Sequence, residues 1–468
     1  MIKVIKVNPE RVYYNFQGGM PPISLEAEAA VPWTNGSRGQ PKLITDTTLR
    51  DGAQDARFAL FPNEVRLQYV DLLHELDNGT GCIYAIETFI YQRRDHWVLD
   101  RLLEREYRYP KITTWIRANP KDVKELYEVS QGRVKETGML ASASDHHIFD
   151  KLGFQSKEEA LQKYLKPILT ACEYGMMPRV HLEDTTRADI YGWVIPFIQT
   201  VLEQTEGRAK FRVCDTIGWG VPDPYASLPF GIPRLISTLK METGAELEFH
   251  GHNDFGLATA NGLAAWRYGC DKVNVTFGGL GERTGNTALE QIVSGYIRLY
   301  GDPGFRLDVL PEMRTLIEEH LTSLSPHAPI VGDVFTTQAG IHQAGVARQE
   351  EAAGGLIYLA YDPTLIGRKE TESSVIGALS GAEGIVPLLN REAERRGLAL
   401  HFTNVSRVVK DIYDRIQAAY DGHYDATLDR WLNYRTTFFT PGEIWHMAEE
   451  LGALSNSSAL DLAEGACV

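Results

Sequence analysis

Two histidines separated by one residue, His250 and His252, are the side chains of this sequence best suited to bind a metal ion. They lie in the run ELEFHGHND (residues 246–254), which we expect to form a β-strand. Since alternate side chains of a strand point to the same side, both imidazoles would face the same way. A lone His-x-His pair also occurs among hydrogen-bonded histidines of cores and surfaces, so further ligands are needed to indicate a metal site.

Oxygen ligands are available at two other positions of the chain. Asp51 follows the run KLITDTTL (42–49), and Asn286 ends the loop GGLGERTGN (278–286). Two nitrogen and two oxygen ligands, with water or substrate completing the shell, suit Mn²⁺, Mg²⁺ or Zn²⁺. Such an ion could polarise the carbonyl group of a bound 2-oxo acid. Arg50, beside Asp51, could stabilise the alkoxide that forms, or it could serve only in a structural ion pair.

The elements that must position these residues are eight β-rich runs that alternate with helical stretches. A helix is predicted for residues 63–77, whose apolar stripe consists of Val65, Tyr69, Leu72, Leu73 and Leu76. Polar residues gather at the carboxyl ends of seven runs, the face on which (β/α)8 barrels build active sites. We therefore predict an α/β fold with a (β/α)8 TIM barrel; an open doubly wound sheet is the alternative, but it usually has fewer strands. The runs are residues 42–49, 82–90, 111–119, 138–145, 178–186, 211–218, 246–254 and 271–279.

The changes of pattern along the chain predict four parts. Residues 1–41 are rich in Pro, Gly and Asn and are expected to form an irregular N-terminal arm. The TIM-barrel catalytic domain is predicted for residues 42–300, and a helical connector for residues 301–330. Residues 331–468 are predicted to form a mainly helical C-terminal lid and subdomains.

The composition excludes several classes of protein. With 43% hydrophobic and 23% charged residues, the chain has the composition of a globular protein. Its 47 basic and 62 acidic side chains give a net charge of −15, which argues against binding nucleic acid through phosphate contacts. The sequence has no run of about 18 apolar residues that could span a membrane. Five scattered cysteines without a CxxC pair indicate a reducing compartment, and we expect a cytoplasmic location.

Three motifs together resemble a known family, the acetyl-CoA-dependent condensing branch of the DRE-TIM metallolyases. They are DTTLRDGAQ (46–54), HGHND (250–254) and GLGERTGN (279–286). The branch contains 2-isopropylmalate, homocitrate and citramalate synthases and the Re-face-specific citrate synthases. AGIHQAG (339–345) and YLAYDPTLIGR (358–368) are similar to the lid motifs of these enzymes.

The resemblance implies a role for individual residues. The implied metal ligands are Asp51, His250, His252 and Asn286, and the implied catalytic residues are Arg50, Glu183, His342 and Tyr358. Arg50 would stabilise the oxyanion, and Glu183 would act as a catalytic or orienting carboxylate. His342 and Tyr358 match the lid residues proposed to deprotonate the methyl group of acetyl-CoA. One position departs from the family pattern, because Thr337 stands where the first histidine of the lid motif is expected.

Substrate specificity is expected to depend on polar residues near the ends of the runs. The candidates are Gln54, Arg117, Ser144, His147, Arg179 and Thr185, and the resemblance adds Thr216 as a group that holds the carboxylate of the 2-oxo acid. A dicarboxylate requires a cation or several hydrogen-bond donors at its distal end. This polar lining favours oxaloacetate or 2-oxoglutarate over 2-oxoisovalerate.

Together these features predict condensation of acetyl-CoA with oxaloacetate to give citrate and CoA. Homocitrate synthase and 2-isopropylmalate or citramalate synthase activities are the alternatives. The resemblance implies a divalent ion, with Mn²⁺ expected before Mg²⁺, Co²⁺ or Zn²⁺, and a homodimer that exchanges its lid regions. Since the chain ends at Val468, we expect no leucine-sensing domain. A metal-dependent amidohydrolase and a catalytically inactive metabolite-binding protein are the interpretations from other classes.

Overall fold

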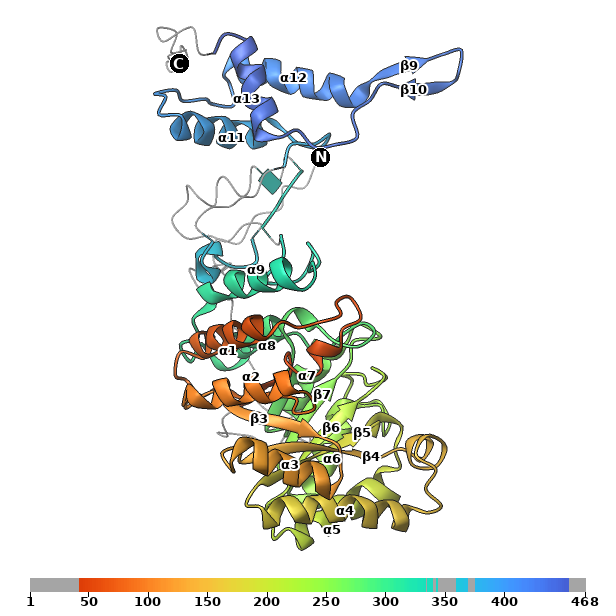
Figure 1. Cartoon of the computed structure of the whole chain (residues 1–468). Coiled ribbons are helices and arrows are strands. Elements are labelled where there is room, and N and C mark those ends of the chain that lie inside the picture. The colour runs from red at the N-terminus through yellow and green to blue at the C-terminus, as the bar shows by residue number, and fades with distance from the viewer. Residues whose placement is uncertain (1–41, 334, 340–341, 344–358, 369–374, 454–468) are drawn as a thin grey trace, which may run out of the picture. The chain divides into compact units, whose positions relative to one another are not determined.

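The computed structural model describes residues 42–333, 335–339, 342–343, 359–368 and 375–453. These residues belong to two compact units, which divide between residues 334 and 335. We call residues 42–333 the barrel unit and the described residues from 335 to 453 the C-terminal unit (Figure 1). The predicted N-terminal arm, residues 1–41, lies outside the described residues.

Eight parallel strands of the barrel unit close into a barrel in which each strand pairs with its neighbours in chain order. Closure is made by β1, which pairs with β2 on one side and with β8 on the other. The TIM-barrel fold predicted from the sequence is therefore confirmed. The strands are β1 (Leu43–Asp46), β2 (Ile83–Thr88), β3 (Lys111–Ile116), β4 (Glu136–Ser142), β5 (Met177–Glu183), β6 (Lys210–Asp215), β7 (Leu247–Gly251) and β8 (Lys272–Val275).

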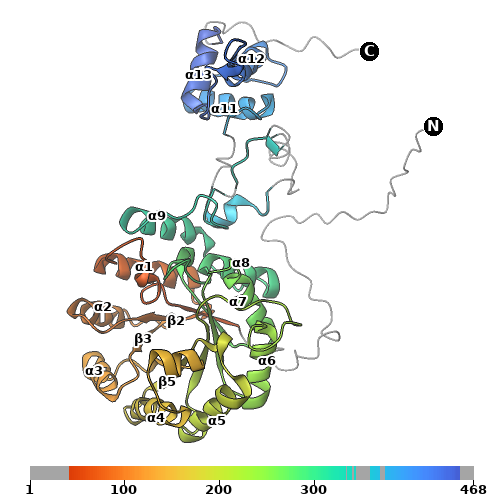
Figure 2. The ribbon, with the colours of Figure 1, turned by 90° about the vertical axis from the view of Figure 1, so that its right-hand side faces the viewer.

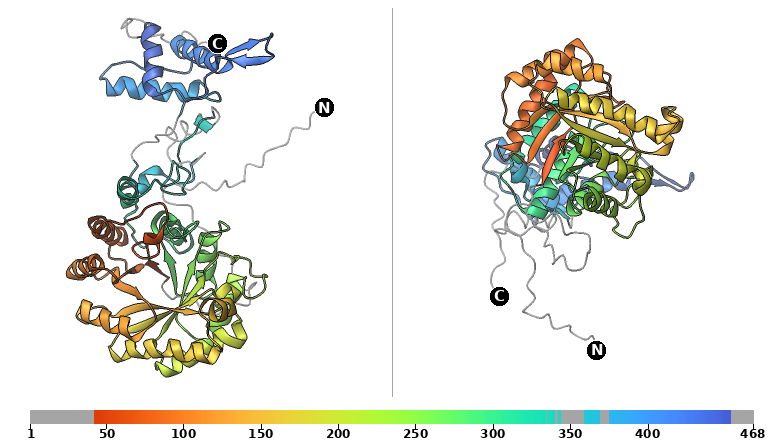
Figure 3. Two further views of the ribbon diagram at one scale, coloured as in Figure 1. Left: turned by 45° about the vertical axis from the view of Figure 1, so that its right-hand side comes forward. Right: turned by 90° about the horizontal axis from the view of Figure 1, so that it is seen from below.

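A helix follows each strand and lies on the outside of the barrel (Figure 2; Figure 3). The first of them, α1, begins at Asn63 and ends at Asp77, as the sequence predicts, and its apolar stripe is buried. Asn78 then adopts a left-handed conformation with φ of 51°, a common way to end a helix. The others are α2 (Arg93–Glu104), α3 (Pro120–Ser130), α4 (Lys157–Glu173), α5 (Ile195–Gln204), α6 (Ile232–Thr243), α7 (Ala258–Arg267) and α8 (Leu289–Tyr300).

The barrel unit continues beyond α8. In the segment predicted as a connector, α9 (Leu310–His320) packs against α1 of the barrel. Four residues of α9 are buried by this packing and by the preceding turn, namely Leu310, Met313, Leu316 and Ile317.

The C-terminal unit is mainly helical in its described part and has a hydrophobic core of its own. It contains α11 (Ala382–Arg395), α12 (Arg407–Asp421), α13 (Pro441–Glu450) and a short antiparallel hairpin, β9 (His423–Asp425) with β10 (Arg430–Leu432). The amphipathic helices bury Ile385, Leu389, Ile412 and Trp445 among others. None of the described helices of either unit is long and apolar enough to cross a membrane.

Candidate metal centre and active site

Asp51, His250 and His252 converge at the carboxyl ends of β1 and β7. One ligand atom of each lies within 4.8 Å of the other two. The Nε2 atoms of the two imidazoles are 3.4 Å apart, and Asp51 Oδ2 is 3.6 Å from His250 Nε2 and 3.8 Å from His252 Nε2. All three residues are buried. The structure thus brings together three of the four residues that the sequence predicted as metal ligands.

The fourth predicted ligand, Asn286, is held beside His252. Backbone atoms of the two residues form an isolated antiparallel bridge. The amide Nδ2 of Asn286 donates to the Leu280 carbonyl at 2.9 Å, which leaves Oδ1 as the other end of the side chain. The loop needs its glycines for this arrangement, because a Cβ atom on Gly281 would overlap the Asn286 side chain.

Unpartnered polar atoms indicate that this set of residues suits a bound cation. Asp51 Oδ2 and Asn286 Oδ1 are buried and have no hydrogen-bond partner among the described residues. Buried polar atoms without partners are rare in native proteins, and an unseen ion is one physical explanation. Two imidazole nitrogens and two oxygens form a mixed set that fits a divalent metal with open positions.

The protonation states also fit metal binding. Burial lowers the pKa of both His250 and His252, so the imidazoles are neutral near pH 7. Burial alone would raise the pKa of Asp51, but the Arg50 guanidinium and the two imidazoles hold it well below its usual range. Side chains must be deprotonated to bind a metal ion, and the Asp51 carboxylate and the two imidazoles already are near pH 7.

Arg50, the predicted oxyanion-stabilising residue, is fixed next to the metal ligands. Its Nη1 donates to Asp51 Oδ1 at 2.7 Å, and its Nε donates to Glu87 Oε2 at 2.8 Å. The guanidinium carbon lies 5.8 Å from the centre of the Trp115 ring. Among the described residues, Arg50 Nη2 takes part in no hydrogen bond. The Arg50 side chain thus forms structural ion pairs through Nε and Nη1 and keeps a hydrogen-bond donor available at Nη2.

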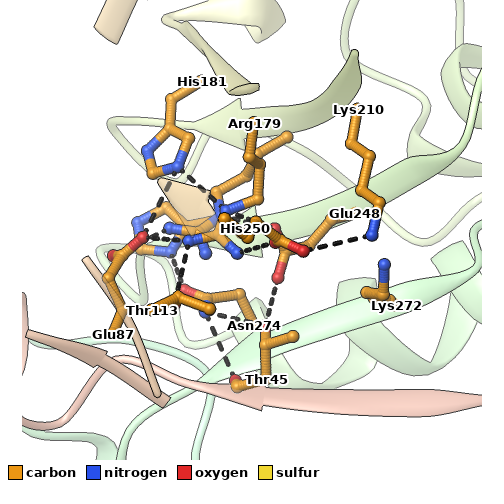
Figure 4. Close-up of polar contacts among 12 residues, drawn as sticks. Thr45, Glu87, Thr113, Arg179, His181, Lys210, Glu248, His250, Lys272 and Asn274 are labelled. Atoms are coloured by element: carbon orange, nitrogen blue, oxygen red, sulfur yellow. Dashed lines mark hydrogen bonds and ion pairs between the residues drawn. The ribbon is translucent and has the colours of Figure 1, made fainter. Parts of the chain in front are cut away.

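Beneath this site the barrel interior holds a buried network of charged residues, part of which Figure 4 shows. Arg179, a sequence candidate for the substrate pocket, belongs to it. This residue is 2% exposed, and its guanidinium pairs with Glu87 and Glu136 at 2.5 Å and with Glu248 at 3.4 Å. Arg179 therefore fills the barrel rather than lining an open pocket. The signal for this was in the sequence, where charged and polar residues alternate along β5 as Arg179, His181 and Glu183.

Residues 42–317 match the sequence profile of the family described as HMGL-like. The chain belongs to the HMGL-like family. The resemblance to DRE-TIM metallolyases found in the sequence is thereby confirmed.

Three curated relatives show which members of the HMGL-like family this chain is similar to. The chain is 37% identical to a protein named Citrate (Re)-synthase from Clostridium kluyveri over 74% of this chain and 76% of that protein. It is 39% identical to a Citrate (Re)-synthase from Syntrophus aciditrophicus over 74% of this chain, but it spans only 55% of that longer relative. A 2-phosphinomethylmalate synthase from Streptomyces hygroscopicus is 34% identical, with 83% of this chain and 84% of that protein covered.

In this HMGL-like barrel, Glu183 at the end of β5 is the centre of a hydrogen-bonded cluster. It accepts from Ser142 Oγ at 2.7 Å, from His147 Nδ1 at 2.9 Å and from Lys151 Nζ at 2.9 Å. Burial opposes ionisation, but the bonds from His147, Lys151 and Ser142 lower the pKa of Glu183 to about 2. Such a carboxylate is suited to orient neighbours rather than to exchange protons near pH 7. The sequence did not single out Ser142 or Lys151, which lie in a strand and in a charged segment without a recognisable motif.

The structure places two of the predicted substrate-binding threonines near this cluster. Thr216 Oγ1 accepts from the backbone N–H of Asp184 at 2.8 Å. Thr185 is buried, and its hydroxyl donates to the Leu182 carbonyl at 2.6 Å. Both hydroxyls therefore serve the local backbone at the ends of β5 and β6.

The remaining predicted residues are spread over different parts of the chain. The side chain of Arg117 is 64% exposed, pairs with Asp122 at 2.9 Å and stacks over Tyr91 at 4.6 Å. Gln54 is exposed in the short 3-10 turn after β1. His342 lies in the C-terminal unit and is exposed. Tyr358 lies outside the described residues.

Proposed function

We propose that this protein is a divalent-metal-dependent acyltransferase that condenses acetyl-CoA with oxaloacetate to give citrate and CoA. The observation that carries the proposal is the 37% identity to a protein named Citrate (Re)-synthase over about three quarters of both chains. The convergence of Asp51, His250 and His252 supports it, because condensation at a carbonyl group needs an electrophilic catalyst. Homocitrate, citramalate and 2-isopropylmalate synthases are also relatives, at 29–31% identity, and remain the alternative activities.

A divalent ion held by Asp51, His250, His252 and Asn286 would polarise the carbonyl group of the 2-oxo acid. Arg50 supplies a guanidinium beside Asp51 and stabilises the negative charge that develops on the carbonyl oxygen. Its ion pairs hold it in place before the reaction begins, which avoids reorganisation at the transition state.

The acetyl group must lose a methyl proton before it can attack. We assign this proton transfer to His342 and Tyr358, in agreement with the resemblance of their motifs to the lid motifs of condensing enzymes. The resulting enolate carbon bonds to the carbonyl carbon while the C=O double bond becomes a single bond, and the carbonyl oxygen takes up a proton to become a hydroxyl group. One water molecule then hydrolyses the thioester, which gives the new carboxylate of citrate and releases CoA. Exclusion of bulk water from this step protects the enolate.

The two carboxylates of oxaloacetate require separate partners. We propose Thr216 and Gln54 for the carboxylate next to the carbonyl group, and His147 and Arg117 for the distal one. Thr185 would support this end of β5 without a direct bond to the substrate, because its hydroxyl already donates to the Leu182 carbonyl. His147 is suitable because its ring is held at the end of the barrel by Glu183 and Asp184, which lie 2.9 Å and 3.6 Å from its two nitrogens. Glu183 then orients His147 rather than reacting itself.

Several finer properties belong to the same proposal. We propose Mn²⁺ as the ion, since the mixed nitrogen and oxygen ligand set suits it, with Mg²⁺, Co²⁺ and Zn²⁺ as alternatives. From the family resemblance we also propose a homodimer that exchanges its C-terminal lids, and a cytoplasmic location.

The decisive experiment is a thiol-release assay with acetyl-CoA and Mn²⁺. Oxaloacetate, 2-oxoglutarate, pyruvate and 2-oxoisovalerate are compared at equal concentration, and we expect the fastest release of CoA with oxaloacetate. The prochirality of the citrate formed from labelled oxaloacetate then tests Re-face addition. Release of CoA with 2-oxoisovalerate alone would show that the assigned substrate is wrong.

A further inference from the structure

Behind His250, on the neighbouring strand β8, lies a buried asparagine that the proposed mechanism does not use. Asn274 is 0% exposed, and its side-chain oxygen Oδ1 is 2.8 Å from His250 Nδ1. His250 uses its other nitrogen, Nε2, toward Asp51 and His252. The imidazole is therefore contacted by Asn274 on one side and faces the metal ligands on the other.

The orientation of the Asn274 amide is determined by two contacts with Thr45 on β1. Asn274 Nδ2 is 3.3 Å from the Thr45 carbonyl oxygen and 2.9 Å from Thr45 Oγ1 (Figure 4). A backbone carbonyl can only accept a hydrogen bond, so the group that faces it must be the amide NH₂. The side-chain oxygen of Asn274 must then face His250.

The hydroxyl of Thr45 leads to the same orientation independently. It donates to the Glu248 carboxylate, which Arg212 Nε holds at 2.8 Å and which is an acceptor only. With its single proton engaged there, the Thr45 hydroxyl can only accept from Asn274. Both contacts with Thr45 thus require Asn274 to present Oδ1 to the histidine.

We infer that Asn274 is a positioning residue that fixes His250 as the tautomer protonated at Nδ1. An acceptor opposite Nδ1 requires an N–H at that atom, and a neutral imidazole then carries its lone pair on Nε2. That lone pair lies where Asp51 and His252 converge, so His250 is prepared as a ligand before an ion arrives. This inference rests on the metal centre of the proposed function. Loss of such an orienting contact typically costs roughly 10–100-fold in metal affinity.

The first test needs no variant and no metal. Nitrogen-15 NMR of the metal-free protein labelled at histidine distinguishes the two neutral tautomers, and a His250→Gln spectrum identifies the His250 signals. We expect His250 to be protonated at Nδ1. A His250 ring protonated at Nε2 would overturn the inference.

The second test measures Mn²⁺ affinity without substrates, by titration calorimetry, for two variants of nearly equal size. Asn274→Leu removes the acceptor and should weaken Mn²⁺ binding by roughly 10–100-fold. Asn274→Asp retains an acceptor for Nδ1 but places a carboxylate oxygen against the Thr45 carbonyl, so it should bind Mn²⁺ more tightly than Asn274→Leu and less tightly than the unaltered protein. Asn261→Leu is the matched control, since Asn261 is equally buried but bonds to the Gly220 carbonyl instead.

The outcomes separate the two levels of the proposal. If Asn274→Leu binds Mn²⁺ as tightly as the unaltered protein, Asn274 has no positioning role. The same conclusion follows if Asn274→Asp and the Asn261→Leu control lose as much Mn²⁺ affinity as Asn274→Leu does. If the unaltered protein binds none of Mn²⁺, Mg²⁺, Co²⁺ and Zn²⁺, the proposed metal centre itself is wrong. Should Asn274→Leu fail to fold, the NMR measurement and Asn274→Asp still decide the question.

Discussion

Glu87→Gln removes one negative charge from the barrel interior while it keeps the size of the side chain. Glu87 is 1% exposed and accepts from Arg179 at 2.5 Å, Arg50 at 2.8 Å and Arg212 at 3.1 Å. Burial opposes its ionisation, but Arg212, Arg50 and Arg179 hold the pKa of Glu87 well below its usual range. A glutamine at this position removes a negative charge that balances the positive charges of these guanidinium groups. It also points an amide NH₂ group toward one of them.

The size of the effect follows from this burial. Breaking a buried ion pair by removing one partner costs about 3–5 kcal/mol of unfolding free energy. For a domain the size of the barrel, each kcal/mol shifts the melting temperature by about 2–4 °C, so we expect a decrease of about 6–20 °C. Arg50 also loses one of its two anchors, and displacement of such a group by about 1 Å can reduce kcat by roughly 100-fold.

Calorimetric melting and the thiol-release assay together measure both effects, and Glu75→Gln is the control. Glu75 pairs with Arg306 at 2.9 Å in the same unit, but both side chains are nearly half exposed, so this substitution should change little. Mn²⁺ affinity should also change little in Glu87→Gln, because Glu87 contacts none of the proposed metal ligands directly within the described residues. A Glu87→Gln protein that melts together with Glu75→Gln would refute the argument that Glu87 holds the buried guanidinium groups.

Three further predictions concern the metal centre, the substrate and pH. His252→Ala should abolish both Mn²⁺ binding and CoA release, as calorimetry and the thiol assay will show, whereas the exposed His423→Ala should leave both unchanged. Arg117→Ala should raise the KM for oxaloacetate by roughly tenfold while Mn²⁺ affinity stays the same, and an unchanged KM would remove Arg117 from the proposed pocket. Burial raises the pKa of Glu290 from 4.5 to about 7, so the folded state retains a proton that the unfolded state releases. Stability should therefore fall between pH 4.5 and 7 by about 3 kcal/mol through this group, and urea unfolding of Glu290→Gln should show a correspondingly smaller fall.

The alternation of strands and helices could be predicted from the sequence because it depends on local hydrophobic patterns. Every strand of the barrel overlaps the run predicted for it. The errors in strand bounds have a physical cause: β4 begins at Glu136 and β6 at Lys210, before the predicted runs. These two charged residues are buried together, with Lys210 Nζ 3.1 Å from Glu136, and a hydrophobicity criterion excludes such residues from strands.

The metal ligands could be predicted for a different reason, since each lies in a short motif whose chemistry is visible in the residues themselves. Asn274 could not be found in this way. Its role depends on which strand lies beside β7 and on the contacts of its amide with Thr45, and both are properties of the closed barrel. The same holds for Arg179, which the sequence suggested for the substrate pocket. Its guanidinium pairs with glutamates from three other strands, and these contacts too are a property of the closed barrel.

The contacts among the buried charges connect one side of the metal centre to the other. A continuous chain of hydrogen bonds connects His250, Asn274, Thr45, Glu248, Arg212, Glu87, Arg50 and Asp51 in that order. Buried ion pairs contribute little net stability compared with well-packed apolar residues, so stability alone does not account for them. They do contact a proposed metal ligand at each end of the chain, His250 on β7 and Asp51 in the turn after β1. A hydrophobic barrel interior would be easier to fold, but it could not fix the orientation of a histidine and an arginine at once.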